Sequence, residues 1–346
     1  MKKLLLGMPA DELRKLAGAS GEKEFRGKQV ADWIYRQGCR EIDGMKNLPD
    51  AFKISLLGGY EVGRSETVKI NRSKDGTFKL LLMPAYGELI ETVGMPYSDR
   101  FSCCVSTQVG CSIGCAFCAT GACGFKRNLA VGEIIDQVLT VQEIALREKL
   151  LPAGGRVSHV VFMGMGEPLI NYDATLAAVK LLNTELNIGM RNITVSTIGY
   201  VPGIYKLSKE KLQITLAVSL HASEDSLRRR LVPGMSRYKL EEIVEACRAY
   251  FDETGRRVSF EYCLLKGIND SKDDAARLAV LIRGLNCHVN LIPYNAVEGC
   301  VYRSPEQARV ADFRQVLEDA SIVVTQREQR GSGIEAACGQ LRRKSL

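Results

Sequence analysis

The stretch VGCSIGCAFCATGACGF, residues 109–125, places Cys111, Cys115 and Cys118 in a C-x3-C-x2-C spacing among glycines. Thiolates so close together on one loop are soft ligands, which suit iron–sulfur clusters and zinc. Three thiolates leave one position of a metal centre open. A [4Fe–4S] cluster with one unliganded iron can hold a small molecule at that position and transfer an electron to it.

A structural zinc knuckle is the alternative interpretation of this stretch. Such sites close at four protein ligands, commonly paired cysteines or cysteines together with histidine. The nearest histidine in the sequence is His159, although Cys123 could supply a fourth sulfur. We therefore favour the open iron–sulfur cluster over the closed zinc site.

The composition indicates a globular protein with a sizeable core. Of 346 residues, 46% are apolar and 25% are charged, and 47 Lys and Arg against 40 Asp and Glu give a net charge of +7. This small excess suits a polyanionic partner, but it suits plain solubility equally well. The absence of a long apolar run predicts no membrane partner, and 12 cysteines without a secretory leader predict a reducing, cytoplasmic location.

The chain divides by composition and pattern into four predicted parts. They are a helical accessory domain (1–55), a small β linker (56–96), a core (97–330), and a mobile glycine-rich loop with its tail (331–346). In the first part, the spacing of Phe25, Val30, Trp33 and Ile34 predicts one apolar helix face. Its basic residues suit an RNA backbone or a solvated surface, and the sequence leaves both interpretations open.

From residue 101 onward, apolar β-branched runs alternate with helical patterns. The predicted strands are 102–106, 158–163, 192–197, 214–219, 259–264 and 288–292, and the predicted helices between and after them are 131–148, 172–183, 202–209, 240–255, 272–284 and 305–320. Buried strands alternating with helices predict a parallel sheet covered by helices. Six units are too few for a closed eight-fold barrel, so we expect an α/β fold, a partial (βα)6 TIM-like barrel.

Four further motifs follow the ends of predicted strands, and a fifth lies near the end of the chain. They are GMGEPL (164–169), STIG (196–199), SLHA (219–222), HVNLIPYN (288–295) and AACGQL (336–341). Ligands of such sheets collect at the carboxyl ends of the strands, so we expect one ligand to contact several of these motifs.

With the cysteine spacing, these motifs resemble the radical S-adenosylmethionine (SAM) enzymes that methylate C2 of adenine in both ribosomal and transfer RNA. The resemblance covers nearly the whole chain, most firmly residues 91–341. It implies a radical SAM core and a [4Fe–4S] cluster bound by Cys111, Cys115 and Cys118. It also implies that SAM contacts Gly166, Glu167, Ser196, Ser219, Leu220, His221 and Asn295.

The resemblance also implies how the reaction proceeds. Adenine C2 is an electron-poor carbon that cannot displace a methyl group from a sulfonium, whereas a thiolate can. Cys338 would therefore take a methyl group from one SAM, and a second SAM would generate the radical that joins this carbon to the base. Glu91 would accept the proton from the base, and Cys104 would release the product through a transient disulfide with Cys338. Because side chains alternate along a strand, Cys103 should face the other way.

The implied partners are 23S rRNA, at an adenine of the peptidyl transferase centre, and tRNA, at the adenine 3′ of the anticodon. A reductant such as flavodoxin or ferredoxin and a monomeric state are also expected. Basic residues near the motifs could bind RNA or form a solvated rim: Lys126, Arg127, Arg228–Arg230, Arg327, Arg330 and the tail 342–344. Two other functions remain as alternatives: the related adenine-C8 methyltransferase of antibiotic resistance, and a non-catalytic zinc-knuckle RNA-binding protein.

Overall fold

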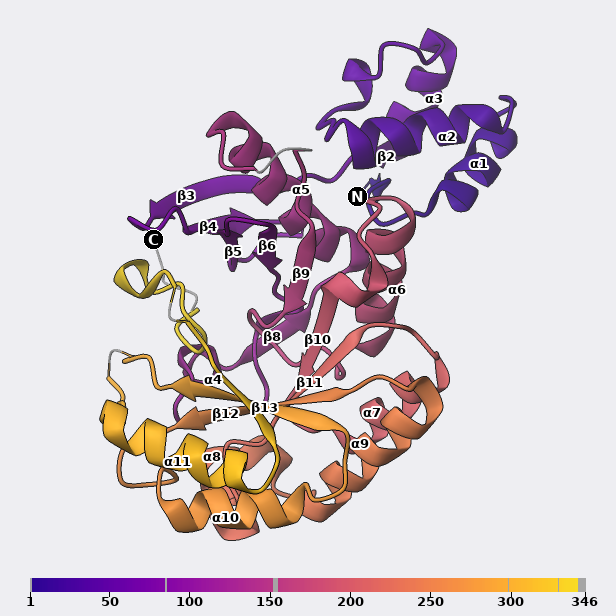
Figure 1. Cartoon of the computed structure of the whole chain (residues 1–346). Helices are drawn as coiled ribbons and strands as arrows, with labels where there is room; N and C mark the ends of the chain where they lie inside the picture. Colours follow the sequence, from indigo (N-terminus) through magenta and orange to yellow (C-terminus); the bar gives the residue numbers. More distant parts are fainter. Residues whose placement is uncertain (1, 85, 152–154, 298, 329, 342–346) are drawn as a thin grey trace.

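The structure is a computed structural model that describes residues 2–84, 86–151, 155–297, 299–328 and 330–341. The basic tail predicted at 342–344 lies outside the described residues. Figure 1 shows a helical module at one end of the molecule and a sheet with outer helices that forms the rest. Within the described ranges, no helix is both long enough and apolar enough to cross a bilayer.

The helical module contains α1 (Ala10–Ala19), α2 (Phe25–Ala31), η1 (Asp32–Arg36), η2 (Ile42–Gly44) and α3 (Asp50–Gly59). A short parallel pair, β1 (Lys3–Leu4) with β2 (Tyr60–Glu61), joins its two ends. The predicted apolar face is correct for Val30 and Ile34, which are buried. It is wrong for Phe25, which is 49% exposed. Trp33 is half-buried and donates its indole N–H to Asn47 at 2.6 Å.

Ten strands form one continuous sheet in the order β14-β13-β12-β11-β10-β9-β6-β5-β4-β3. From β6 to β14 every neighbouring pair is parallel, whereas β3, β4, β5 and β6 pair antiparallel. The strands are β3 (Glu66–Arg72), β4 (Phe78–Met83), β5 (Ile90–Pro96), β6 (Phe101–Cys104), β9 (His159–Phe162), β10 (Ile193–Thr197), β11 (Thr215–Ser219), β12 (Val258–Leu264), β13 (Cys287–Pro293) and β14 (Val323–Gln326).

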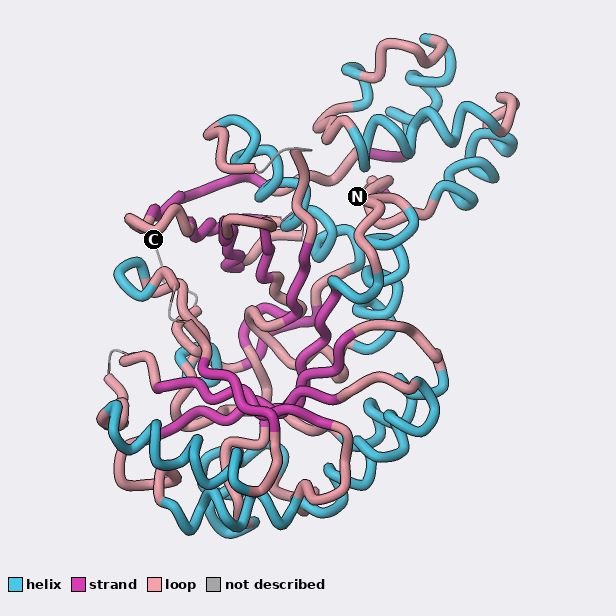
Figure 2. Tube along the Cα trace, in the orientation of Figure 1, coloured by secondary structure: helices cyan, strands magenta, loops and turns pink. Residues whose placement is uncertain are grey.

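The parallel strands curve with helices on their outer side, as Figures 1 and 2 show. The helices are α5 (Val131–Arg147), α6 (Tyr172–Thr184), α7 (Val201–Lys209), α8 (Asp225–Leu231), α9 (Leu240–Thr254), α10 (Lys272–Leu281) and α11 (Gln307–Asp319). Every residue of β12 is buried, as expected of a strand covered on both faces. The prediction of a partial (βα)6 barrel in an α/β fold is therefore confirmed, with β14 as a further parallel strand.

Three features of the fold were absent from the sequence-based prediction. The hairpin of β7 (Gln108–Gly110) and β8 (Phe125–Asn128) encloses the cysteine loop, which also contains the short helix α4 (Ala119–Ala122). Helix α8 follows the SLHA motif. The β linker 56–96 extends the core sheet, because β5 pairs with β6. The boundaries predicted for the four parts of the chain remain a prediction.

A buried ion pair joins the β linker to helix α5 of the core. Arg64 pairs with Asp136 of α5, and both side chains are almost fully buried. Asp136 also accepts a hydrogen bond from the backbone N–H of Ser65 at 2.6 Å, and Arg64 donates to the carbonyl of Gly38 at 2.6 Å. Module, linker and α5 therefore meet at one buried charge pair.

Replacement of Asp136 by Ala should destabilise the fold strongly, because it leaves the buried Arg64 guanidinium with only Glu143, a half-exposed carboxylate at 3.3 Å, as its counter-ion. We expect a loss of about 3–5 kcal/mol in the free energy of unfolding, measured by urea titration. Asp50→Ala is the control, since Asp50 pairs with Lys53 at the surface and its side chain is 93% exposed. Equal effects of the two substitutions would contradict the role assigned to the buried pair.

Candidate active site

The β7–β8 hairpin fixes the shape of the cysteine loop. Gly110 has φ +78°, and a Cβ at this position would lie 1.8 Å from the carbonyl oxygen of Gly124. A side chain is therefore excluded where the two strands approach, and the loop between them returns tightly on itself. The backbone N–H of Cys111 donates to the same Gly124 carbonyl at 3.0 Å.

Cys111, Cys115 and Cys118 line the wall of one cavity of about 170 Å³. Burial raises the pKa of each thiol, to about 12 for Cys111. As thiolates they therefore need a nearby cation. Among the described residues, no three His, Cys, Asp or Glu side chains converge on a single metal ion. The ligands of a four-iron cluster each bind a different iron, so three thiols spread along one wall could hold such a cluster.

The carboxyl ends of the parallel strands form the opposite wall of this cavity. Three strands, β9, β10 and β11, or the loops after them contribute predicted SAM contacts that line it: Gly166, Glu167, Ser196, Ser219 and His221. The predicted contact Leu220 does not line it, because its side chain is fully buried in the hydrophobic core. Asn295 lies in the wall of the neighbouring cavity. The structure therefore brings five of the seven predicted SAM contacts into one cavity with the three cysteines.

Glu167 connects two strand ends through its carboxylate. One oxygen accepts the N–H of Leu169 at 3.0 Å and the other accepts the N–H of Ile198 at 2.7 Å. Burial raises the pKa of Glu167 to about 7, and these backbone hydrogen bonds oppose the shift. Gly166 has φ +105°, and a Cβ there would lie 2.6 Å from the Gln108 side chain. The motif thus needs glycine directly before the buried carboxylate.

His221 is a neutral, oriented ring. Burial lowers the pKa of His221 to about 3, and the Arg228 cation lowers it further. Its Nδ1 accepts the backbone N–H of Cys263 at 3.0 Å, so Nε2 carries the ring proton. The ring meets Phe117 of the cysteine loop edge to face, with centroids 5.0 Å apart. His221 can therefore donate a hydrogen bond to a ligand in the cavity.

The structure places Arg228 in the interior, contrary to the prediction from the sequence. The sequence predicts that Arg228 binds RNA or lies on a solvated rim, but this residue is 2% exposed. Its guanidinium donates to the carbonyls of Ser219 at 3.1 Å and, more closely, of Leu220 and Ile198. Arg228 precedes the buried Leu231 by three positions, so helical spacing could have indicated that it faces inward.

A second cavity adjoins the first, and Cys338 lines both. Cys104 and Asn295 line the second, and Asn295 donates its amide N–H to the carbonyl of Cys338 at 3.2 Å. Burial raises the pKa of Cys104 to about 12, the Cys338 thiol adds to this shift, and the Arg327 cation opposes it. All 12 cysteines belong to the described part of the chain and are free thiols, so the disulfide expected from the resemblance is not formed here.

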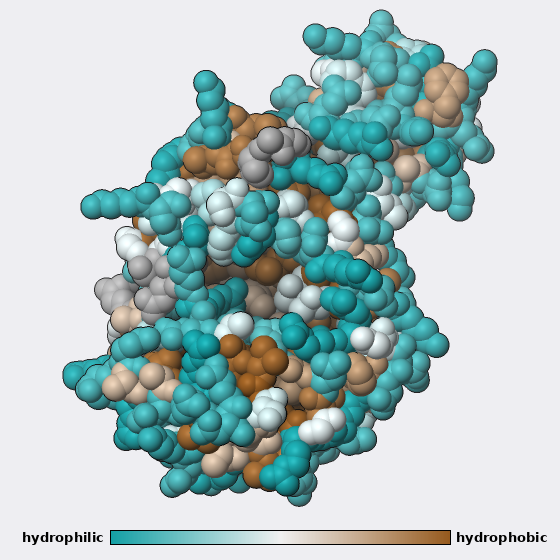
Figure 3. Space-filling view, viewed as in Figure 1, coloured by the Kyte–Doolittle hydropathy of each residue, from teal (hydrophilic) through white to brown (hydrophobic). Residues whose placement is uncertain are grey.

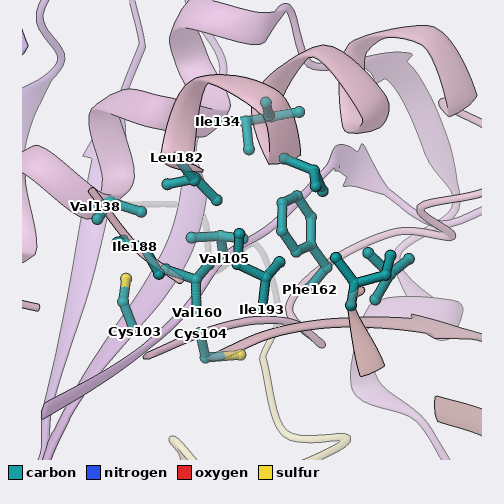
Figure 4. Close-up of a cluster of buried hydrophobic side chains, with 14 of the residues drawn as sticks. Cys103, Cys104, Val105, Ile134, Val138, Val160, Phe162, Leu182, Ile188 and Ile193 are labelled. Carbon is teal, nitrogen blue, oxygen red and sulfur yellow. The ribbon is translucent and has the colours of Figure 1, made fainter. Parts of the chain in front are cut away.

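Strand register decides which neighbouring cysteine faces this cavity. Cys104 pairs with Val93 of β5, and Cys103 pairs with Gly94. The two thiols therefore point to opposite faces, and Figure 4 shows the Cys103 sulfur among apolar side chains and the Cys104 sulfur on the other side of the strand. The alternation expected from the sequence is present, with Cys104 toward Cys338.

Glu91 shares the sheet face of Cys104 but lines neither cavity. It is 4% exposed, and Lys79 of β4 pairs with it at 2.8 Å. Lys79 also donates to the carbonyl of Glu335, in the loop that carries Cys338, at 3.0 Å. One ammonium group that the sequence analysis missed therefore connects Glu91 to this loop.

Both ends of the loop 331–341 are anchored to the rest of the molecule. Gly331 donates its N–H to Asp75 at 3.2 Å, at the hairpin before β4. At the other end, Ala119 of α4 donates to the carbonyl of Gly339 at 2.8 Å, and the Thr120 hydroxyl donates to that of Leu341. The loop is thereby held between the antiparallel strands and the cysteine loop. Figure 3 shows a hollow in the drawn face of the molecule.

Arg327 was also expected at a rim, but it lies in the wall of both cavities. Its guanidinium is 3.4 Å from the Met163 sulfur and 3.6 Å from a carboxylate oxygen of Glu261. The Cys338 thiolate is the largest cause of the raised pKa of Arg327. The structure therefore adds a half-buried cation beside the two predicted catalytic thiols.

Family models match both the core and the helical module. Residues 105–279 match the radical SAM superfamily, and residues 4–60 match the ribosomal RNA large subunit methyltransferase N-terminal domain. A Gloeobacter violaceus protein named "Probable dual-specificity RNA methyltransferase RlmN" is 50% identical over 99% of this chain and 96% of its own length. A Thermosynechococcus vestitus protein of the same name is 46% identical, over 99% of both chains.

A solved structure supports the fold over almost the full length. The radical SAM methyltransferase from Sphaerobacter thermophilus superposes with a TM-score of 0.93 at 45% identity, covering 98% of this chain and 99% of that one. The likeness therefore includes the helical module and the antiparallel strands as well as the barrel.

Cys115→Ser should remove most of the iron bound after anaerobic reconstitution, because one of three ligand thiols is lost. Iron and acid-labile sulfide, measured against protein, should fall well below the equal amounts expected for the unaltered chain. Cys123→Ser is the matched control: its thiol is exposed, is outside the cavity, and should leave the iron content unchanged. Iron loss in the Cys123 variant, or one zinc per chain in colourless protein, would instead support the zinc knuckle.

Proposed function

The chain belongs to the RlmN family of radical SAM RNA methyltransferases, and from this membership we propose that it methylates C2 of adenine in RNA. The observation that supports this proposal best is the position of Cys338. Its thiol lies between a cavity lined by three cysteines and the predicted SAM contacts and a cavity lined by Cys104. A methyl group that Cys338 accepts from SAM in the first cavity would then face adenine in the second cavity.

Cys111, Cys115 and Cys118 would hold a [4Fe–4S] cluster, which supplies the electron for reductive cleavage of SAM. Around the ligand, Glu167 provides a carboxylate for its ammonium group, and His221 provides an N–H donor from Nε2. Ser196 and Ser219 add hydroxyl groups at neighbouring strand ends. Seven contacts were expected for SAM, and Leu220 would contribute through its backbone only.

The transfer itself uses two thiols in turn. The Cys338 sulfur displaces the methyl group from the sulfonium of one SAM and releases S-adenosylhomocysteine. Once the carbon is joined to adenine, the adduct must lose both the C2 proton and one electron, for which the oxidised cluster would be the acceptor. The Cys104 sulfur then attacks the Cys338 sulfur. The bond from Cys338 to carbon breaks, its electron pair and a proton complete the new methyl group, and the two sulfurs remain as a disulfide. An external reductant must return two electrons before the next turnover.

Glu91 is the proposed proton acceptor. Its carboxylate shares the sheet face of Cys104, and its partner Lys79 also binds the Cys338 loop through the carbonyl of Glu335. A movement of the loop that brings Cys338 to the base would therefore also change the surroundings of Glu91. Removal of the proton from adenine would therefore depend on the position of the loop 331–341.

The proposed substrates are the adenine of the peptidyl transferase centre in 23S rRNA and the adenine 3′ of the anticodon in tRNA. The cytoplasmic location, the flavodoxin or ferredoxin reductant and the monomeric state remain predictions from the resemblance. Methylation at C8 is the alternative within the same fold. Incubation with labelled SAM and both RNAs, followed by mass spectrometry of the digested nucleosides, decides between the two carbons. A C8 product, or no RNA product, would overturn the proposal.

Cys338→Ala should abolish RNA methylation, because no side chain remains to accept the methyl group. Cleavage of SAM by the reduced protein should persist, since the cluster ligands and most SAM contacts are unchanged. The measurement is methylated adenine by mass spectrometry, with 5′-deoxyadenosine from the same samples. Methylated adenine formed at the rate of the unaltered chain would show that the carbon never resides on Cys338.

Cys104→Ala should trap RNA on the protein, because the adduct at Cys338 loses the thiol that releases it. Denaturing gels should show a covalent protein–RNA species that nuclease treatment shortens. Cys103→Ala is the matched control, since this neighbouring thiol faces away from Cys338, and it should turn over without a trapped species. Release at the ordinary rate in the Cys104 variant would refute the proposed step.

A further inference from the structure

Three side chains form a stack beside the second cavity, and no step described above uses it. Tyr97 lies between two guanidinium groups, with the central carbons of Arg100 and Arg330 each 4.1 Å from its ring centroid. Tyr97 and Arg330 line the second cavity together with Cys104 and Cys338. The stack therefore borders the chamber in which RNA would meet the methyl-carrying thiol.

Backbone contacts hold this stack in place. The N–H of Tyr97 donates to the carbonyl of Arg100 at 2.9 Å and closes the turn between β5 and β6. Arg330, which directly precedes the Cys338 loop, donates to the carbonyl of Pro96 at 2.8 Å. A guanidinium stacked on an aromatic ring keeps N–H groups at its edge available, so both groups are ordered before a ligand arrives.

The charges around the stack favour an anion as its ligand. Two cations held against one ring repel each other. Asp99 lies 3.1 Å from Arg100, and Glu328 lies 3.2 Å from Arg330. Both carboxylates are about 70% exposed (69% and 72%), and exposed pairs of this kind are weak. Phosphate groups bind guanidinium in two-point geometry and would neutralise both charges.

We propose that the stack of Arg100, Tyr97 and Arg330 binds the RNA phosphates that flank the target adenine. A base that enters the second cavity remains attached to its backbone, so the flanking phosphates must lie at the border of that cavity. Contacts to phosphate position the strand and carry no sequence information, which suits an enzyme with two different RNA substrates. The inference rests on the proposed function and names the residues that present the RNA to it.

The test compares Arg100→Gln and Arg330→Gln with Arg314→Gln. Arg314 is the control on α11, because it also pairs with one carboxylate, Glu318, at 2.7 Å, and lies outside both cavities. The probe is an RNA stem-loop with the target adenine in its loop, and the dissociation constant is measured at several KCl concentrations. Each stack variant should bind about tenfold more weakly. Each should also reduce the slope of log affinity against log salt by about 0.7, whereas Arg314→Gln should change neither quantity.

Substitutions of Tyr97 test whether RNA binding needs the stacked ring or only the charges of the two arginines. Tyr97→Phe keeps the ring and should bind RNA as the unaltered chain does, whereas Tyr97→Ala should weaken binding because both guanidinium groups lose their support. Salt slopes that stay unchanged in both arginine variants would overturn the inference.

Two further measurements on the holoenzyme distinguish a failure of the inference from a failure of the proposed function. Methylation of Cys338 by SAM without RNA, followed by peptide mass, should be the same in the variants as in the unaltered chain. Its loss would assign the stack to positioning of the loop and would also overturn the inference. If the unaltered chain binds the stem-loop with these slopes but methylates no adenine, the proposed function fails and the phosphate contacts stand.

Discussion

The site depends on the backbone of one residue, Ile198, at the end of β10. Its N–H donates to Glu167, which follows β9, and its carbonyl accepts from Arg228, which also binds the carbonyls of Ser219 and Leu220 at the end of β11. The buried carboxyl group of Glu167 and the buried guanidinium of Arg228 thus hold three neighbouring strand ends in register around the first cavity. Buried charges are tolerated there because each is hydrogen-bonded to backbone groups that would otherwise be unsatisfied.

The antiparallel strands complete the site from the other side. Because β5 pairs with β6, the accessory strands continue the barrel sheet and carry Lys79 and Glu91 to the level of Cys104. The same strands and their turns contact the Cys338 loop through Asp75 and Lys79. An extension that the sequence analysis treated as a linker therefore supplies part of the second cavity's surroundings, and its fixed position determines where the loop can rest.

Sequence patterns predicted the site best where the chemistry of a ligand or the geometry of a strand requires a fixed spacing between residues. The interval between Cys111, Cys115 and Cys118 indicated a shared ligand, and the period of two along a strand separated Cys104 from Cys103. Arg228 was placed wrongly, because the sequence does not show that the partners of this arginine are backbone carbonyls at the ends of neighbouring strands. Arg327 is half-buried and borders both cavities, so both interpretations of this residue stay open. The prediction for Phe25 was wrong in the opposite sense. Its spacing suits a buried face, but the helix begins at this residue, and the ring is 49% exposed with the Arg26 guanidinium 4.7 Å from its centroid.

The amino-acid sequence alone predicted the alternation of strands and helices and the curved parallel sheet, from hydrophobic period, and the three candidate cluster ligands, from spacing and donor chemistry. The roles of the catalytic thiols were indicated only by the family resemblance. Only the tertiary structure decided which of these groups meet. It placed Cys338 between two cavities, joined Glu91 to the loop through Lys79, and stacked Tyr97 between Arg100 and Arg330. Such contacts join residues up to more than 200 positions apart, and local periodicity carries no information about distance across a fold.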